Sequence, residues 1–221
     1  MIYGEAGNDR LFGDNGNDLL DAGLGHDTVH GGLGDDLMVA QIGDGNDIYD
    51  GGAGIDTLDY GALTEGVDVN LGTGVGGRGS VTGSQSGTDT LYGIENITTG
   101  SGNDVIEASN AVNVIDGGDG NDVFVFGSAT AAHGDTIVGF EAGDKIDLSG
   151  IDADTGVAGV QSFTLVTGQT ATAPAQIVVT HEVREDGEYT VISGNTAGGD
   201  APEFRISLTG NHTLTGSDFN L

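Results

Sequence analysis

Residues 13–39 read GDNGNDLLD AGLGHDTVH GGLGDDLMV, which is one nine-residue pattern written three times without a gap. The pattern is Gly-Gly-x-Gly-x-Asp-x-U-x, in which U is a large apolar residue. Acidic, glycine-rich composition is typical of disordered chains, but a disordered chain has no reason to keep an aspartate and an apolar residue in a fixed register. The repeat therefore predicts a solenoid of identical small units.

Working outward, the same frame covers the first 59 residues. Units start at Gly4, Gly13, Ala22 and Gly31, and after a two-residue insertion at Ile42 and Gly51. The sixth position is always aspartate, and the eighth is always apolar or aromatic. These two sets are Asp9, Asp18, Asp27, Asp36, Asp47 and Asp56, and Leu11, Leu20, Val29, Met38, Tyr49 and Leu58.

A second, looser block runs from Ser84 to Val125. Its four units start at residues 84, 99, 108 and 117, and their sixth positions hold Asp89, Asp104, Asn113 and Asp122. The unit with Asn113 also has Ala111 where the pattern asks for glycine. We expect weak metal binding or none in that unit.

The residue types of one unit suit a hard cation. Glycine tolerates the positive φ angles that curl a loop until its carbonyl groups point inward. Ca²⁺ takes six to eight oxygen ligands from carboxylates and carbonyls, whereas Mg²⁺ demands stricter geometry and resists dehydration. We therefore predict calcium, with roughly five to nine ions. The predicted metal-site residues are Gly4, Asp9, Gly13, Asp18, Asp27, Gly31, Asp36, Asp47, Gly51, Asp56, Asp89, Asp104, Gly117, Asp122, Asp135, Asp144 and Asp147.

The last three residues of a unit, such as Leu19–Asp21 or Thr57–Asp59, predict a short strand whose middle side chain enters the core. Two units complete a coil, so each loop should stack on the loop about eighteen residues away, with one ion shared between them. The expected pairs are Asp9 with Asp27, Asp18 with Asp36, Asp27 with Asp47, and Asp36 with Asp56. The predicted fold is all-β, a right-handed parallel β-roll.

Charge and composition exclude several classes of function. There are 35 acidic and 5 basic residues, for a formal charge of -30, so the chain needs cations and cannot track nucleic-acid phosphates. The sequence has no cysteine, which removes disulfides and thiolate metal sites. No apolar run is long enough to insert into a membrane, and the first residues lack a cleavable leader.

These repeats resemble the repeat-in-toxin (RTX) family, whose nonapeptides wind into a calcium-binding β-roll. The resemblance implies a secreted, extracellular protein that leaves the cell unfolded through type I secretion machinery and folds outside. The end of the chain, Thr215–Leu221, resembles the uncleaved tail that this machinery reads. We expect calcium and the secretion machinery as partners, and a monomer.

Residues 134–149 resemble the closing segment of serralysin-type protease C-terminal domains and of alginate-epimerase repeat modules. Asp135, Asp144 and Asp147 could hold one more ion there, or lie in a solvated loop. Alternating apolar patterns at 162–166, 176–179 and 203–208 predict antiparallel strands that cap the open end of the roll. The stretch 182–188 reads as a charged hairpin turn.

The sequence therefore divides into a first repeat block (1–59), an insertion that continues the roll with a strand pair and a glycine-rich loop (60–83), a second repeat block (84–133) and a C-terminal cap with the secretion signal (134–221). We expect a noncatalytic calcium-binding module, because His-Glu-x-x-His and Gly-x-Ser-x-Gly motifs are absent. It could be the C-terminal part of a larger secreted enzyme. Two alternatives stay open, namely a module that binds an alginate-like extracellular polysaccharide and a fragment of an adhesin or surface layer.

Overall fold

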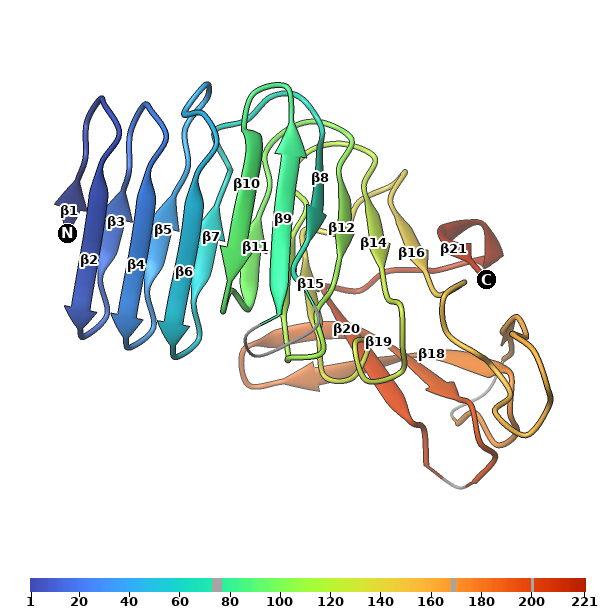
Figure 1. Cartoon of the computed structure of the whole chain (residues 1–221). Coiled ribbons are helices and arrows are strands. Elements are labelled where there is room, and N and C mark those ends of the chain that lie inside the picture. The colour runs from blue at the N-terminus through green and yellow to red at the C-terminus, as the bar shows by residue number, and fades with distance from the viewer. Residues whose placement is uncertain (73–76, 168–169, 200) are drawn as a thin grey trace.

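The computed structural model describes residues 1–72, 77–167, 170–199 and 201–221, and in them two sheets face each other along a roll (Figure 1). The chain alternates between the sheets, so each coil contributes one short strand to each of them. Neighbouring strands along the roll are parallel and eighteen to twenty residues apart at its N-terminal end. The fold is the predicted parallel β-roll.

The 11-stranded sheet runs in the order β1 (Ile2–Tyr3), β3 (Leu19–Asp21), β5 (Leu37–Val39), β7 (Thr57–Asp59), β11 (Asn96–Thr98), β13 (Val114–Asp116), β15 (Thr136–Val138), β20 (Phe204–Thr209), β19 (Gly187–Asn195), β18 (Gln176–Arg184) and β17 (Thr164–Leu165). The 10-stranded sheet runs β2 (Arg10–Asn15), β4 (Thr28–Leu33), β6 (Ile48–Ala53), β10 (Gly87–Tyr92), β9 (Arg78–Gly83), β8 (Val67–Asn70), β12 (Val105–Glu107), β14 (Val123–Val125), β16 (Lys145–Asp147) and β21 (Phe219–Asn220). A single 3-10 turn, η1 (Gly216–Asp218), is the only helical element in these ranges.

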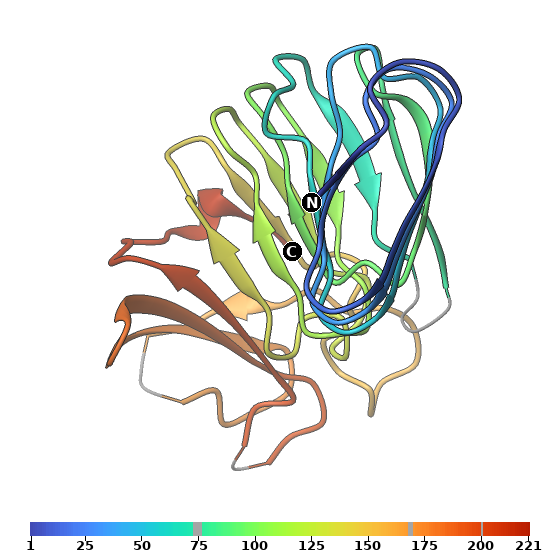
Figure 2. The same cartoon turned by 90° about the vertical axis from the view of Figure 1, so that its left-hand side faces the viewer.

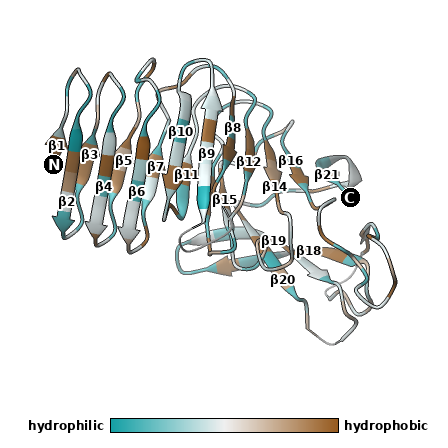
Figure 3. Ribbon diagram, in the orientation of Figure 1, coloured by the Kyte–Doolittle hydropathy of each residue, from teal (hydrophilic) through white to brown (hydrophobic). Residues whose placement is uncertain are grey.

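The core is a double row of position-eight side chains between the sheets. Leu20, Val29, Met38 and Leu58 are fully buried, while residues on either side of each face outward or lie at the surface. Figure 3 shows this as hydrophobic bands that recur from strand to strand. One apolar side chain per strand is enough because the opposite sheet covers it, so the chain reaches a dry core with little hydrophobic content.

The segment between β7 and β10 interrupts the regular winding. After β7 the chain crosses to β8, turns back as β9 and turns again as β10, and both β8–β9 and β9–β10 pair antiparallel. One sheet thereby gains two strands that its partner lacks. Tyr49 and Tyr60 fill the interior beside this insertion with an edge-to-face contact, 6.5 Å between ring centroids. Part of the predicted glycine-rich loop, residues 73–76, lies outside the described residues.

The C-terminal cap extends the 11-stranded sheet away from the roll axis (Figure 2). As predicted, β18, β19 and β20 are antiparallel, and the stretch between Arg184 and Gly187 turns as a hairpin. The prediction was wrong for residues 162–166, because β17 pairs parallel with β18. Alternation of apolar residues sets which face is buried but carries no information on strand direction.

The last coil is made by the end of the chain. β20 pairs parallel with β15, and the chain then crosses to the other sheet, where β21 pairs parallel with β16. Phe219 is buried in the core, and Lys145 donates to the backbone carbonyl of Ser217. A capping box between Thr215 and Asp218 fixes the turn before β21. In the described ranges no helix has the length and apolar content that a membrane span needs.

Candidate metal centres

The loops of the first repeat block share one backbone geometry. Positions two and four of each unit have φ between about +67° and +152°, which is the left-handed region. Gly117–Asp122 in the second block repeats it, with Gly118 at φ 73° and Gly120 at φ 151°. The position-two and position-four residues of the first block are Glu5, Gly7, Asp14, Gly16, Gly23, Gly25, Gly32, Gly34, Gly43, Gly45, Gly52 and Gly54.

At several of these positions glycine is needed for space as well as for φ. A Cβ on Gly34 would lie 2.5 Å from the backbone oxygen of Gly16 in the preceding coil, well inside van der Waals contact. At position one of the unit, glycine is needed for a different reason. A Cβ on Gly31 would lie 2.3 Å from Oδ2 of Asp36 and 2.6 Å from the carbonyl oxygen of Gly51. The missing side chain leaves a small cradle where a carboxylate and a carbonyl from the next coil converge.

The position-six residues form two hydrogen-bonded ladders, one at each loop edge of the roll. In every step the backbone N–H of one position-six residue donates to Oδ1 of the next, at 2.7 to 2.9 Å. The Asp9 ladder runs Asp9, Asp27, Asp47, Asp89, and resumes after the insertion with Asp104, Asp122, Asp144; the Asp18 ladder runs Asp18, Asp36, Asp56. We call each neighbouring pair a rung. The structure thus brings together all four predicted pairs.

The second carboxylate oxygen of most ladder residues is buried without a donor. Within the described chain, Oδ2 has no hydrogen-bond partner in Asp9, Asp27, Asp36, Asp56, Asp104, Asp122 and Asp135. A buried unpaired carboxylate is among the most costly groups in a protein interior. Burial accordingly raises the pKa of Asp56 to about 6 and the pKa values of Asp122 and Asp135 to about 7.

These oxygens fit a calcium ion. They are hard anionic donors, one from each of two stacked loops, and carbonyl oxygens face them across the position-one cradles at Gly4, Gly13, Gly31 and Gly51. No three His, Cys, Asp or Glu side chains converge as a metal-binding group in the described chain. Carbonyl oxygens must therefore supply the rest of any coordination shell.

The rung at the insertion differs from the others. Tyr49 donates its hydroxyl to Oδ2 of Asp47 at 3.2 Å, and Tyr60 donates to Oδ2 of Asp89 at 2.6 Å. Both second oxygens of this rung therefore have protein donors. Burial still raises the pKa of Asp89 to about 7. Asp144 is also satisfied, because the backbone N–H of Glu141 donates to its Oδ2 at 2.7 Å.

Two acidic residues that sequence reasoning missed lie beside the ladders. Glu95 takes the place of an aspartate, since the N–H of Asp56 donates to its Oε2 at 3.0 Å. Glu95 lies eighteen residues before Asn113, which is the distance between stacked loops, so this spacing could have revealed it. Asp44 is buried with Oδ1 unpartnered, and burial raises its pKa to about 6. Asp44 occupies a variable position of its unit, so the pattern carries no signal for it.

Asp135, Asp144 and Asp147 do not form the common site that their spacing suggested. Asp135 accepts the N–H of Asn113, whereas Asp144 accepts the N–H of Asp122 in the other ladder. Asp147 lies on the outer face of β16, where Ser149 and Asn220 donate to it and lower its pKa. The physical reason is the winding, which places consecutive units on opposite edges of the roll.

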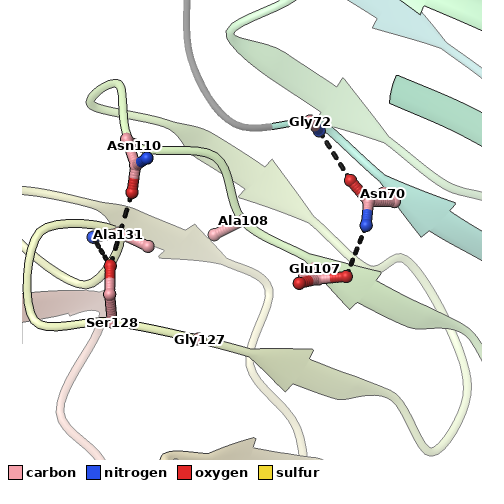
Figure 4. Close-up of a pocket in the computed structure, with 8 residues that line it drawn as sticks. All are labelled: Asn70, Gly72, Glu107, Ala108, Asn110, Gly127, Ser128 and Ala131. Carbon is pink, nitrogen blue, oxygen red and sulfur yellow. Dashed lines mark hydrogen bonds between the residues drawn. The ribbon is translucent and has the colours of Figure 1, made fainter. Parts of the chain in front are cut away.

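A surface pocket of about 250 Å³ lies apart from the ladders (Figure 4). Asn70 donates to Glu107, and Ser128 on a neighbouring loop donates to Asn110 at 3.3 Å. Glu107 is the only acidic side chain among the residues drawn, and none of them is a histidine. The pocket therefore offers neither a metal-binding cluster nor a general acid–base pair.

Comparison with known families agrees with this geometry. The model for the peptidase M10 serralysin C-terminal domain matches residues 47–221, which is most of the chain. The chain belongs to the serralysin C-terminal family. A second model, the RTX calcium-binding nonapeptide repeat in four copies, matches residues 3–38, which precede the segment matched by the serralysin model. RTX repeats bind calcium, so the domain is a calcium-binding β-roll.

Among solved structures, the domain is similar to the solution structure of the AlgE6R3 subunit from the Azotobacter vinelandii mannuronan C5-epimerase. The sequences are 19% identical, the match covers 94% of this chain and 80% of that one, and the TM-score is 0.41. A search of curated proteins finds no match.

Proposed function

We propose that this chain is a noncatalytic module that folds on binding calcium after type I secretion, and thereby stabilises a secreted protein in the extracellular space. The observation that carries the proposal is the row of buried, unpartnered Oδ2 atoms along both ladders. Without cations these carboxylates oppose folding. With calcium between stacked loops, each ion adds binding free energy that exists only in the folded state.

The number of ions follows from the rungs. Seven hydrogen bonds join two aspartates of a ladder, and in one of these pairs, Asp47 with Asp89, tyrosine hydroxyls occupy both second oxygens. We assign calcium to the other six pairs, within the range expected from the sequence. The position-six aspartates and position-one glycines of those units are the proposed ligating residues.

The cap and the tail fit a protein that folds after export. The cap covers the last coil, and the proposed secretion tail forms β21 with Phe219 buried. A transporter could read that tail only in the unfolded chain, so export has to precede folding. Low calcium inside the cell and high calcium outside would impose this order.

Far-UV circular dichroism of the metal-stripped chain, recorded during a calcium titration with magnesium as control, tests the folding switch. We expect a cooperative gain of β signal with calcium alone. A complete β signal in excess chelator would show that the repeats are structural without being a switch, and would favour the scaffold and polysaccharide-binding alternatives.

Removal of residues 150–221 tests the role of the cap. Folding of a solenoid propagates between neighbours and needs a closed end. We expect the truncated chain to require more calcium and to fold less cooperatively. A truncated chain that folds as cooperatively as the full chain would contradict the role assigned to the cap.

A further inference from the structure

Asn113 lies on the same loop edge as the Asp18 ladder, beyond Asp56 and Glu95, at a position where a neutral side chain replaces the usual carboxylate. It is fully buried, and its backbone N–H donates to Oδ1 of Asp135 at 2.9 Å, as a ladder residue should. Its side chain behaves differently from the aspartates. The amide Nδ2 donates to the backbone carbonyl of Glu95 in the preceding coil at 2.7 Å and to Oγ of Ser109 at 3.0 Å.

Both ends of this amide are satisfied by the protein itself. Oδ1 of Asn113 accepts the N–H of Ser109 at 2.9 Å and lies 3.2 Å from its hydroxyl. No side-chain atom of Asn113 or Ser109 is among the buried polar atoms without a partner in the described chain. By contrast, six position-six aspartates in the loops assigned to calcium each have one oxygen without a hydrogen-bond partner.

The backbone of this loop differs as well. The six loops of the first block have left-handed residues at positions two and four, but residues 108–113 have none. The unit has Ala108, Ser109 and Ala111 at the three positions where the pattern has glycine. Without the two left-handed residues the loop cannot turn its carbonyl groups inward in the same way, so it does not form the oxygen cage that calcium needs.

We infer that the Asn113 amide takes the place of one calcium ion and links the coils of β11 and β13 without metal. An N–H donor aimed at the carbonyl oxygen of Glu95 supplies the electropositive contact that an ion supplies elsewhere. The amide itself brings no charge that needs neutralising, although Oδ2 of Asp135, whose Oδ1 accepts the N–H of Asn113, has no donor in the described chain. This loop edge, next to the cap, is then held together in calcium-free conditions and provides part of the surface on which the calcium-dependent coils assemble. The inference rests on the proposed function, because it divides the same ladders into two classes of rung.

Hydrogen exchange of the full chain in excess chelator tests the inference through two strands. We expect the amides of β13 (Val114–Asp116) to stay protected while those of β5 (Leu37–Val39) exchange freely. The variant Asn113→Asp restores the repeat consensus and adds a buried charge. It should make β13 exchange at least about tenfold faster in chelator, with protection recovered in calcium.

Asn121→Asp is the matched control, because it makes the same change at an exposed position five of the next unit. We expect it to leave β13 exchange unchanged. A wild-type chain in which β13 needs calcium as much as β5 does would overturn the inference, and so would equal exchange of β13 in the two variants. If β5 is also protected in chelator, the folding switch itself fails, and the response of β13 to Asn113→Asp still decides the role of the amide.

Native mass spectrometry gives a second measurement that does not depend on chelator. Asn113→Ala removes the amide without adding charge and should leave the number of bound calcium ions unchanged, whereas Asp36→Ala should lose at least one. An ion lost from Asn113→Ala would place calcium at this rung and overturn the inference.

Discussion

The first repeat block and the second block use the same ladder with different chemistry. In residues 4–59 every loop has two left-handed residues, and the ladders there consist of aspartates alone. In residues 84–125 the ladder positions include Asp89 bonded to a tyrosine, Glu95 and Asn113, and one loop keeps the full glycine geometry. The second block therefore has more of its contacts supplied by the protein itself.

The difference shows how one solenoid can contain parts that respond unequally to a ligand. A rung with two buried unpaired carboxylates is costly to form without a cation at neutral pH, because each charge loses its hydration. A rung closed by an amide or a tyrosine hydroxyl has no such requirement. The N-terminal coils should therefore depend on calcium at both loop edges, whereas the coils next to the cap should depend on it mainly at the edge that holds Asp104 and Asp122.

The largest expected effect is on the whole first block. Chelation of calcium should remove the hydrogen-exchange protection of β3, β4 and β5, while the cap strands β18, β19 and β20 keep most of theirs. The physical reason is that the cap strands bury apolar side chains, including Ile192 and Ile206, which continue the core of the roll, and that no acidic side chain of β18, β19 or β20 is buried. Equal loss of protection in both regions would show that the chain is one cooperative unit and would remove the distinction.

A single ladder residue should have the next largest effect. Asp36 participates in two rungs, with Asp18 and with Asp56. Asp36→Asn keeps the Oδ1 acceptor but removes the charge, and we expect it to raise the calcium midpoint at least about tenfold, equivalent to about 1.4 kcal/mol. Asp186→Asn, in the exposed hairpin turn, is the control and should change the midpoint less than about twofold. Similar midpoints for the two variants, measured by circular dichroism, would refute the ladder assignment.

A change in the loop backbone should have a smaller effect. Gly34 has φ 126°, and a Cβ there would lie 2.5 Å from the oxygen of Gly16. Gly34→Ala should lower the free energy of unfolding in saturating calcium by more than about 1 kcal/mol, measured by denaturant titration. Gly216→Ala is the control, because no atom lies within 4 Å of the added Cβ. Unchanged stability in Gly34→Ala would mean that the loop relaxes freely.

The smallest expected effect is that of pH on the calcium-free chain. Burial raises the pKa of Asp56 to about 6 and that of Asp122 to about 7 in the folded state, from an ordinary value of 3.8. Folding then takes up protons, so these groups favour the fold at low pH and this contribution is lost as pH rises toward 7. The β signal in chelator should increase from pH 8 to pH 5, but not in saturating calcium. A decrease on acidification would contradict this sign.

The regular part of the fold could be predicted from residues 13–39 alone, because the nonapeptide sets both the strand positions and the distance between stacked loops. Leu20, Val29 and Met38 are buried as predicted, and the four expected aspartate pairs lie next to each other. A pattern that repeats in sequence gives contacts that repeat in space, so local information is enough there.

Departures from the repeat were harder to predict because long-range contacts decide them. The path β8, β9, β10 leaves two strands in one sheet only, and neither composition nor alternation indicates on which side. Glu95 replaces an aspartate in a unit shortened to six residues between β10 and β11, so a search for nine-residue units passes over it. The parallel direction of β17 depends on where the chain returns after Leu165, which short-range patterns do not encode.

The two strands that the insertion adds have a geometric consequence. Strands in a sheet lie about 4.8 Å apart, so one side of the roll is longer than the other by about 10 Å at that coil. When one coil of a stack is thicker on one side than on the other, the axis of the stack bends at that coil. We therefore expect the roll axis to bend at β8 and β9, so that these two strands set the direction of the preceding coils relative to the following ones.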